Sequence, residues 1–594
     1  MASGEIPTGR GQLDARLPLS YRGARVVLRH LAITTALLGV LAAAAQAQQP
    51  TVLVPGMTYE KKVEHTLHGP VRIHIVTAPK PGAFYRLLPG LTAGSVQGRQ
   101  RLSATERRLT ASAAVVGVNG DTADTRAGPE GLLLREGILQ TPPDPERSSL
   151  AVDSSGRLRI DRVGFSADWQ GSGPPRLLKG LNQRPRPGRV TLYTPSWGAR
   201  TPKSSQMFEV ILATFPAVKP GLELTGRVIS RGNGGGHVIP RRGAVLSAKA
   251  SARGRLAGEA GIGRLVTVRF FLDGFAGVSE AIGGGPLLVE HGRPVFDASE
   301  SFAPSWLVPP KPRTAVGQRA DGSLIFIVVD GSKPGYSNGL TNFELAKTMA
   351  AEGAVTAMAF AGGPSATMAY DGTLLNRPPA GEKPIADALL LTYDGVQAPP
   401  PSAAVLSPNG DGVAESEALA YKLVRPATIT AKLIGPGGAV RTFAGGVKAL
   451  PGLHQFSWTG LDSTRRLEAE GTWVWRVEAL DDLGRRSVAT RSFLLDTTLK
   501  GLSVQPALLR RGGVQIDVDL LHPSVLTLQV ETRSGVLLRT LVSSPAAAGH
   551  VSRRWSGRVR GRLLAPGRYA IRAIAENAIG RMDLVAPFRA ARRR

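Results

Sequence analysis

The chain has 594 residues, with 73 Lys or Arg against 45 Asp or Glu, which gives a formal net charge of +28. The absence of cysteine excludes disulfide scaffolds, thiolate zinc sites and cysteine nucleophiles. Its 71 glycines and 44 prolines favour strands joined by tight turns over a helical bundle, and its length allows several domains.

Residues 1–47 are predicted to be a secretory signal peptide. Arg22, Arg25 and Arg29 precede the uncharged run 31–45, which ends in the small-x-small pattern Ala45-Gln46-Ala47. The run is shorter than the roughly 20 residues of a transmembrane helix, and an uncleaved N-terminal anchor is the alternative. We therefore expect a secreted protein, extracellular or associated with a cell wall, with no transmembrane anchor after signal cleavage.

Residues 51–397 are expected to form one α+β domain that is mainly β with few helices. Apolar runs bounded by turns predict strands at 71–77, 265–271 and 324–329. The helix expected near residues 340–350 has an apolar face made by Phe343, Leu345, Ala346, Met349 and Ala350, and Gly353 follows it as a C-cap. A Pro-rich linker, 398–402, ends this domain.

The C-terminal part contains an internal repeat, which predicts two all-β sandwiches at 403–498 and 499–594. The segment Gly471-Thr472-Trp473-Val474-Trp475 recurs in related form from Gly567 onward. Trp473 and Trp475 are interpreted as core residues, with a sugar-stacking platform as the alternative. Both repeats resemble immunoglobulin-like domains of the flagellar hook-cap type, on the strength of the opening segment 407–412. Asn409 and Asp411 in that segment could bind calcium, but a plain turn is favoured and no cofactor is expected.

Basic residues are concentrated near the C-terminus, where residues 500–594 contain 17 Lys or Arg and 5 Asp or Glu. A basic surface attracts polyanions, and outside a cell these are wall and capsule polymers. The sequence has no zinc finger or RNA-binding signature, so nucleic acid is not expected as a partner. A genome of high GC content that favours arginine would explain the same charge without a functional role.

Several short glycine-rich and polar motifs follow one another along the chain between residues 110 and 395. They are Val118-Asn119-Gly120-Asp121, Gly128-Pro129-Glu130-Gly131, Asn182-Gln183-Arg184 with Leu192-Tyr193-Thr194-Pro195, Gly283-Gly284-Gly285-Pro286, Arg313-Thr314, Asp330-Gly331, Ser337-Asn338-Gly339-Leu340-Thr341, Gly362-Gly363-Pro364-Ser365 and Leu375-Asn376-Arg377. Together they resemble the phosphodiester glycosidase family, whose members remove a sugar from a sugar phosphodiester. The resemblance implies a hydrolase acting on a sugar-phosphate glycan or another anionic wall polymer.

Cleavage of such a bond develops positive charge on the sugar and leaves an anionic phosphate. Asp121 and Asp330 follow apolar strands and are the candidate catalytic carboxylates, and Arg313 is the candidate phosphate ligand. For each aspartate alone, a turn-capping role is the simpler interpretation. The candidate substrate-binding residues are Asn119, Gly284, Gly285, Thr314, Ser337, Thr341, Gly362, Gly363, Ser365 and Asn376. We expect these residues to meet in one pocket; the motifs define no metal site.

Two departures from the family pattern bear on activity. Thr122 and Ala123 follow Asp121 where the family usually has two aromatic residues. Ala361 occupies the position of the aspartate in the family's late Asp-Gly-Gly-Gly-Ser motif, and Pro364 removes an amide hydrogen from that loop. The motifs therefore predict an exported glycosidase whose site is degenerate, and a non-catalytic glycan-binding or wall-attachment protein is the alternative.

Overall fold

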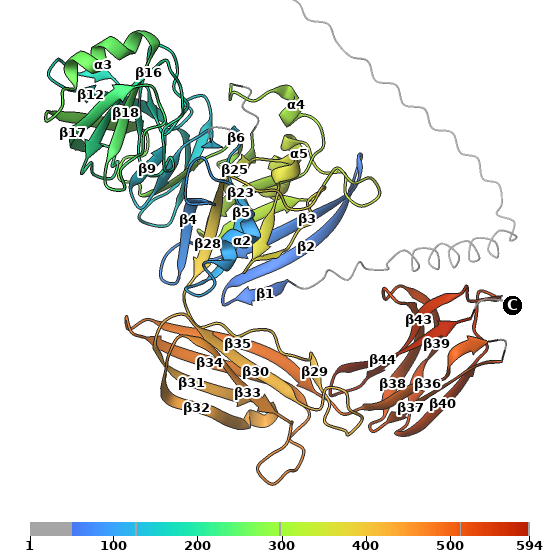
Figure 1. The fold of residues 1–594 in the computed structure, drawn as a ribbon. Coiled ribbons are helices and arrows are strands. Elements are labelled where there is room, and N and C mark those ends of the chain that lie inside the picture. The colour runs from blue at the N-terminus through green and yellow to red at the C-terminus, as the bar shows by residue number, and fades with distance from the viewer. Residues whose placement is uncertain (1–49, 125–127, 296–298, 511, 592–594) are drawn as a thin grey trace, which may run out of the picture. The chain divides into compact units, whose positions relative to one another are not determined.

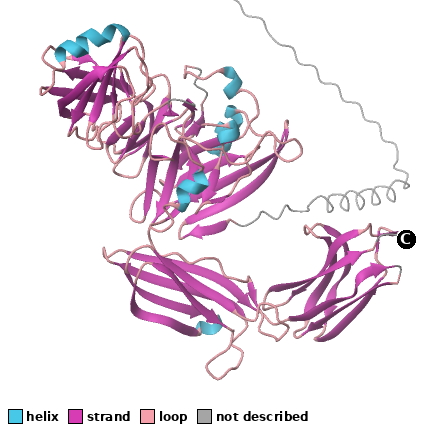
Figure 2. Ribbon diagram, in the orientation of Figure 1, coloured by secondary structure: helices cyan, strands magenta, loops and turns pink. Residues whose placement is uncertain are grey.

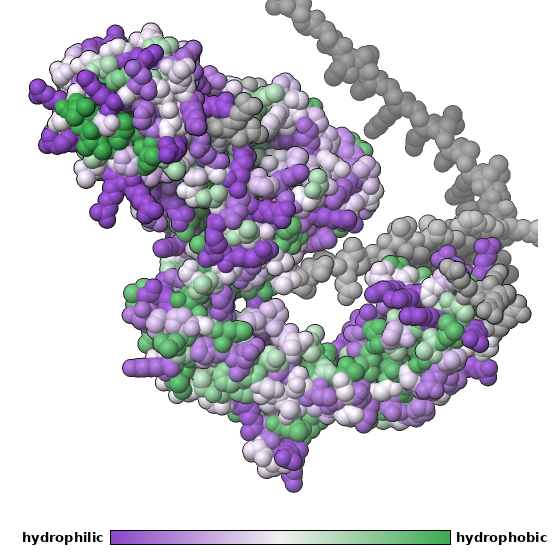
Figure 3. Space-filling model, viewed as in Figure 1, coloured by the Kyte–Doolittle hydropathy of each residue, from purple (hydrophilic) through white to green (hydrophobic). Residues whose placement is uncertain are grey.

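The computed structural model describes residues 50–594 except 125–127, 296–298, 511 and 592–594, so the predicted signal peptide lies outside the described residues. The described chain is mostly β, as Figures 1 and 2 show. Hydrophilic side chains spread over much of the face drawn in Figure 3, with smaller hydrophobic areas between them. Among the described residues, no helix is long and apolar enough to cross a membrane.

An eight-stranded antiparallel sheet forms the centre of the first region, in the order β1-β2-β3-β24-β23-β25-β21-β22. Its strands are β1 (Thr51–Val54), β2 (Met57–Thr66), β3 (Gly69–Ala78), β21 (Leu287–Glu290), β22 (Arg293–Pro294), β23 (Arg313–Arg319), β24 (Leu324–Val329) and β25 (Ala354–Phe360). The apolar run of β24 is buried on both faces, because Phe326 and Val328 pack into one hydrophobic core and Ile325 and Ile327 into another.

A five-stranded sheet packs against this one through a shared core that includes Val116, Phe326 and Leu389. Its order is β27-β26-β5-β28-β4. Its strands are β4 (Tyr85–Leu91), β5 (Ala114–Asn119), β26 (Met368–Tyr370), β27 (Thr373–Leu374) and β28 (Asp387–Tyr393). The ends of β5, β23, β24 and β25 carry most of the predicted site residues, so this pair of sheets positions the candidate site.

Two further sheets complete the first region and share a separate core around Trp169 and Phe270. The five-stranded sheet contains β11 (Leu158–Arg162), β10 (Ser148–Val152), β20 (Glu280–Gly283), β8 (Leu133–Arg135) and β9 (Ile138–Thr141). The eight-stranded sheet contains β13 (Arg176–Leu177), β12 (Gly164–Gln170), β19 (Leu265–Asp273), β17 (Glu223–Asn233), β16 (Met207–Ala213), β18 (Ala244–Lys249), β15 (Val190–Tyr193) and β14 (Gly180–Leu181). A small hairpin joins β6 (Ala123–Asp124) and β7 (Gly128–Pro129).

The helices are short. They are α2 (Leu102–Arg107), α3 (Arg253–Glu259), α4 (Pro304–Leu307) and α5 (Asn342–Ala351), with 3-10 turns η1 (Ala250–Ala252), η2 (Gly363–Ser365) and η3 (Pro436–Gly438). α5 confirms the expected helix: Thr341 is its N-cap in a capping box with Glu344, and Gly353 follows its end with a φ of +88°. The expected apolar face is wrong in one residue, because Phe343 is 47% exposed while Leu345 and Met349 are buried.

The C-terminal part forms two β structures with separate cores. In the first, the sheet β29-β35-β34-β31-β32 and the pair β30-β33 enclose one core, and the second has the order β39-β38-β43-β44-β36-β37-β40. The strands of the first are β29 (Val405–Leu406), β30 (Glu417–Leu423), β31 (Ala427–Ile434), β32 (Val440–Ala449), β33 (Gly452–Trp458), β34 (Gly471–Asp481) and β35 (Arg486–Leu495). Those of the second are β36 (Leu499–Arg510), β37 (Gly513–Leu520), β38 (Ser524–Thr532), β39 (Leu537–Ala546), β40 (Gly549–Trp555), β43 (Gly567–Glu576) and β44 (Arg581–Ala590), with a small pair β41 (Arg558–Val559) and β42 (Arg562–Leu563).

Trp473 and Trp475 are core residues, as predicted, since both are at most 2% exposed and each indole N–H donates to a backbone carbonyl. Asn409 and Asp411 lie in a turn, where each side chain accepts a hydrogen bond from a backbone N–H two residues on. At the predicted linker, Ala398 is buried in the core of the first of these two β structures, and the Ser402 hydroxyl donates to Glu417.

Candidate functional site

A cavity of about 350 Å³ opens among the loops at the ends of β5, β20, β24 and β25. Its described lining residues are Thr122, Gly285, Pro286, Phe302, Trp306, Leu307, Lys311, Arg313, Ser332, Asn342, Phe360, Ala361, Gly362, Gly363 and Pro364. Among the predicted site residues, Gly285, Arg313, Gly362 and Gly363 therefore line one cavity. Lys311 and Arg313 are cationic, and no carboxylate belongs to the described lining.

Arg313 is buried at the start of β23, and carbonyl oxygens accept hydrogen bonds from four of its five N–H groups. The acceptors belong to Leu340, Trp306, Leu307 and Pro309. Burial lowers the pKa of Arg313 to about 10, so the guanidinium stays charged at neutral pH. These hydrogen bonds hold the cavity wall in place. One hydrogen of Nη1 has no acceptor among the described residues, so it is available to a phosphate oxygen.

Asp121 lies directly behind the cavity wall, next to Thr122, and forms a buried ion pair with Arg147. Arg147 also donates to the Thr122 hydroxyl at 2.9 Å and the Gly284 carbonyl at 3.0 Å, and its guanidinium lies 4.6 Å from the Phe302 ring centre. Burial raises the pKa of Asp121, and the nearby Arg147 charge only partly offsets that effect. Arg147 thus connects the predicted carboxylate to three cavity residues or their neighbours.

A second buried carboxylate, Asp387 at the start of β28, lies beside this pair. Neither of its oxygens has a hydrogen-bond partner among the described residues, and the side chain is 1% exposed. Burial, followed by the Asp121 charge, raises the pKa of Asp387 well above its ordinary value. Burial thus disfavours the charged form of Asp387, whereas Asp121 has a cationic partner in Arg147.

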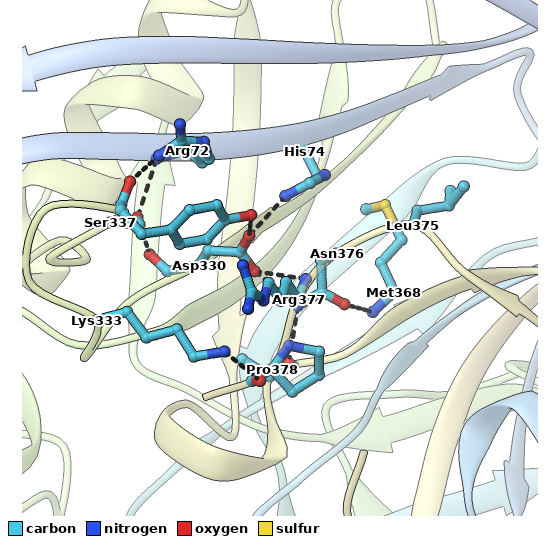
Figure 4. Close-up of polar contacts among 12 residues, drawn as sticks. Arg72, His74, Asp330, Lys333, Ser337, Met368, Leu375, Asn376, Arg377 and Pro378 are labelled. Atoms are coloured by element: carbon cyan, nitrogen blue, oxygen red, sulfur yellow. Dashed lines mark hydrogen bonds and ion pairs between the residues drawn. The ribbon is translucent and has the colours of Figure 1, made fainter. Parts of the chain in front are cut away.

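Asp330 lies at the end of β24 in a separate network, shown in Figure 4. Its carboxylate accepts hydrogen bonds from His74 Nε2 and the Tyr336 hydroxyl at 3.0 Å, from Asn376 Nδ2 at 3.2 Å and from the Arg377 amide at 2.8 Å. Burial would raise the pKa of Asp330, but these donors, His74 first, lower it overall. Asp330 is an ionised carboxylate that is 1% exposed and fully hydrogen-bonded.

Asn119 helps to connect the strand end that carries Asp121 with the one that carries Asp330. Its Oδ1 accepts from the Thr314 hydroxyl at 2.7 Å and the Thr367 amide at 3.0 Å, and its Nδ2 donates to the Ala361 carbonyl at 2.7 Å. Asn376 similarly holds Asp330 and the Met368 amide. The strand ends that carry Asp121 and Asp330 are thus connected through side-chain amides, while Asp330 itself is not part of the described cavity lining.

Other predicted substrate ligands make contacts within the protein. The Ser337 hydroxyl donates to the Asp330 carbonyl, and Thr341 caps α5. The Gly284 amide donates to Ser148 and the Gly363 amide to Pro312. Ser365 ends η2 and is not part of the described cavity lining. Substrate contact by these residues stays a prediction.

The sequence reasoning missed several residues of the cavity. Asn342 lines it with a buried Oδ1 that has no hydrogen-bond partner among the described residues, so this oxygen can accept from a sugar hydroxyl. Phe302 and Trp306 add aromatic surface and Lys311 adds a cation. Glu300 anchors the same loop through the Ser148 and Leu287 amides. Asn342 lies within the predicted helix, where no motif singled it out, and the others lie outside the motifs.

The chain was compared with known proteins. Residues 222–392 match the family model described as phosphodiester glycosidase. The SPbeta prophage-derived uncharacterized protein YomE of Bacillus subtilis strain 168 is 36% identical over 83 residues, which is 14% of this chain and 13% of that protein. A hypothetical protein from Synechocystis is 22% identical in sequence, with a TM-score of 0.50, over 59% of this chain and 64% of that one. The chain thus spans less than two thirds of either relative's length.

The catalytic domain of zebrafish N-acetylglucosamine-1-phosphodiester alpha-N-acetylglucosaminidase is also similar, at 14% identity and a TM-score of 0.32, over 59% of this chain and 86% of that one. The Synechocystis likeness concerns the fold alone. The family model covers Arg313, Asp330 and the Gly362–Gly363 loop, and it confirms the resemblance drawn from the motifs. Residues 222–392 of the chain are thus similar to the phosphodiester glycosidase family.

Proposed function

We propose that this protein is an exported phosphodiester glycosidase that acts on a glycosyl-phosphate linkage in a cell-surface or wall polymer, with weak hydrolytic activity. The observation that supports it best is the cationic and aromatic cavity beside Asp121. Lys311 and Arg313 suit a phosphate, whereas Phe302, Trp306 and Asn342 suit a sugar. Asp121 is the candidate carboxylate next to the lining residue Thr122, and Arg147 holds it in place.

The weak activity follows from the wall of the cavity. Ala361 lies on this wall, so an aspartate there would present a carboxylate to the bound sugar. Thr122, which lies between Asp121 and the cavity, donates to Glu130 at 2.7 Å. A carboxylate that is separated from the sugar by a threonine stabilises the positive charge developing on that sugar less than a carboxylate in direct contact with it.

The test is release of sugar from a panel of glycosyl phosphodiesters by the full chain. We expect slow release, at least a tenfold increase in Ala361→Asp and a loss in Asp121→Asn. Ser332→Asp is the matched control, because it adds the same charge elsewhere on the cavity wall. Fast release by the unmodified chain, lost only in Asp121→Asn or Asp330→Asn, would show that the carboxylate missing at position 361 is dispensable.

A non-catalytic glycan-binding function is the second candidate, and the absence of a carboxylate from the described cavity lining favours it. It predicts that the panel binds with no sugar release in either the unmodified chain or Ala361→Asp. Equilibrium dialysis with the same compounds separates the two candidates.

We further propose that the last repeat attaches the protein to an anionic wall polymer. Its five carboxylates are paired with Arg572, Arg581 and His550. The exposed arginines Arg553, Arg554, Arg558, Arg560 and Arg562 on β40 to β42 have no carboxylate partner among the described residues. Arginines on an edge strand such as β40 also discourage strand pairing between molecules, which is the simpler explanation.

The attachment proposal predicts that binding of the full chain to anionic wall polymer falls steeply as the salt concentration increases. The reason is that the Debye length, over which charges attract each other, falls to about 8 Å near 0.15 M salt. Replacing Arg553, Arg554 and Arg558 by Gln should reduce retention at least fivefold. Three first-repeat arginines, Arg425, Arg476 and Arg486, replaced in the same way, are the control. Retention that ignores salt, or equal losses in both triple variants, would contradict the proposal.

A further inference from the structure

A second cavity, of about 490 Å³, lies at one end of the strands β9, β15, β16 and β18. Its lining comprises 138–139, 194–196, 214–218 and 241–243, and none of these residues lines the cavity described above. Leu139, Phe215 and Val218 form a buried apolar floor. The cavity therefore belongs to a part of the fold for which the proposed reaction gives no role.

The rim of this cavity is cationic. Arg241 and Arg242 are exposed, and neither has a carboxylate partner among the described residues. Three residues with hydroxyl side chains, Thr194, Ser196 and Thr214, line the same cavity, and the described lining contains no carboxylate. Two guanidinium groups together with hydroxyls and an apolar surface suit a ligand that has an anion at one end and a sugar ring at the other.

The wall is built by a motif that the sequence singled out. Asn182 is buried with a φ of +48°, and its Oδ1 accepts from the Thr194 amide at 2.9 Å. Its Nδ2 donates to the Thr194 hydroxyl oxygen and to the Gln140 carbonyl, each at 2.9 Å. Thr214 has a φ of +52°, which is disfavoured for a β-branched residue. The turn that carries Thr194 is thus held in place before any ligand binds.

We infer that this cavity is a binding site for a phosphorylated sugar unit, with the phosphate on Arg241 and Arg242 and the sugar over Phe215. The inference rests on the proposed function, because the ligand would be another unit of the same polymer. β9 contributes Ile138 and Leu139 to this cavity, and at its other end the Thr141 hydroxyl donates to the Gly131 carbonyl at 2.7 Å. Gly131 in turn packs against Asp121, since a Cβ on Gly131 would lie 2.5 Å from Asp121 Oδ2.

Arginine footprinting tests the site on the unmodified full chain. Phenylglyoxal modifies accessible arginines, and mass spectrometry of peptides gives the modification rate at each. We expect α-glucose 1-phosphate to slow the labelling of Arg241 and Arg242 at least threefold and to leave Arg255 and Arg264, two exposed arginines outside the cavity, unchanged. Glucose should give no protection, and inorganic phosphate should protect only at higher concentration.

Variants supply the second measurement, the affinity for α-glucose 1-phosphate by calorimetry in an Arg313→Gln background that weakens the first cavity. Arg241→Gln with Arg242→Gln should weaken binding at least tenfold, whereas Arg255→Gln with Arg264→Gln should not. Equal protection by glucose, equal labelling with and without ligand, or unchanged affinity in the first double variant would overturn the inference. Neither readout requires hydrolysis, so absent protection with normal sugar release refutes only this site, and protection without release refutes only the proposed reaction.

Discussion

Replacing Arg147 by Met tests whether the charged group behind the cavity is as buried as the structure shows. The side chains of Arg147 and Asp121 are 6% and 1% exposed. Removing the arginine leaves the Asp121 carboxylate with the Thr122 donors but without its cationic partner, and it removes a donor from the Gly284 carbonyl. Loss of one partner of a buried ion pair typically costs about 3–5 kcal/mol. We therefore expect the local free energy of opening to decrease by that amount at pH 8 in Arg147→Met.

The cost should depend on pH, because an unpaired Asp121 can lose its charge by binding a proton. We expect a smaller decrease at pH 5, and a coupling of at least about 2 kcal/mol when Asp121→Asn is combined with Arg147→Met. Amide hydrogen exchange of peptides covering β5 and β10 measures the local free energy of opening.

Arg476→Met is the matched control, because its ion pair with Glu478 is 43% and 46% exposed, and removal of a pair of that kind costs less than about 1 kcal/mol. A change in Arg147→Met no larger than in this control, or additive effects of Arg147→Met and Asp121→Asn, would refute the description of a buried and coupled pair.

Two further changes test other parts of the first region. Burial raises the pKa of Glu280 to about 7 from its ordinary 4.5, so the folded chain holds a proton that the unfolded chain releases, and stability falls as pH rises between these values. Because Glu280 is partly exposed, we expect Glu280→Gln to be more stable than the unmodified chain by about 1–2 kcal/mol at pH 8 and equal at pH 4 in urea unfolding; the same difference at both pH values would contradict this. Gly120→Ala would place a Cβ 2.7 Å from Asp387 Oδ1, and we expect it to cost about 1–3 kcal/mol, whereas Gly258→Ala on α3 meets nothing within 4 Å and should be neutral or stabilising.

The strands were predictable where the sequence has continuous apolar runs. The runs 71–77, 265–271 and 324–329 became β3, β19 and β24, because each buries side chains in a shared core. The predicted helix differs mainly at Phe343, which periodicity placed on the buried face. Periodicity shows which residues lie on one face of a helix, but it does not show how much of that face the neighbouring sheet covers.

The candidate site was harder to predict for a physical reason. Asn119, Ser337 and Asn376 are polar residues in glycine-rich turns, a pattern that suits substrate binding and loop closure equally well. In the structure they satisfy buried backbone and carboxylate groups at strand ends, since such groups need partners. Arg147 comes from a loop outside the motifs, and its nearness to Asp121 depends on sheet packing. Lys311 lies two residues before the motif residue Arg313, but no motif marks it as a cavity residue.

The position of Thr122 brings these observations together. Thr122 lines the cavity, and its hydroxyl accepts from Arg147 and donates to Glu130, so in the proposed function this residue would lie between the substrate and the buried charges. A carboxylate at position 361 would act on the sugar directly, whereas Asp121 acts across Thr122 and shares its charge with Arg147. In the proposed function the phosphate would bind Lys311 and Arg313, which line the cavity themselves. We therefore expect the cavity to bind a sugar phosphate better than it cleaves one, and this imbalance is what Ala361→Asp is designed to reverse.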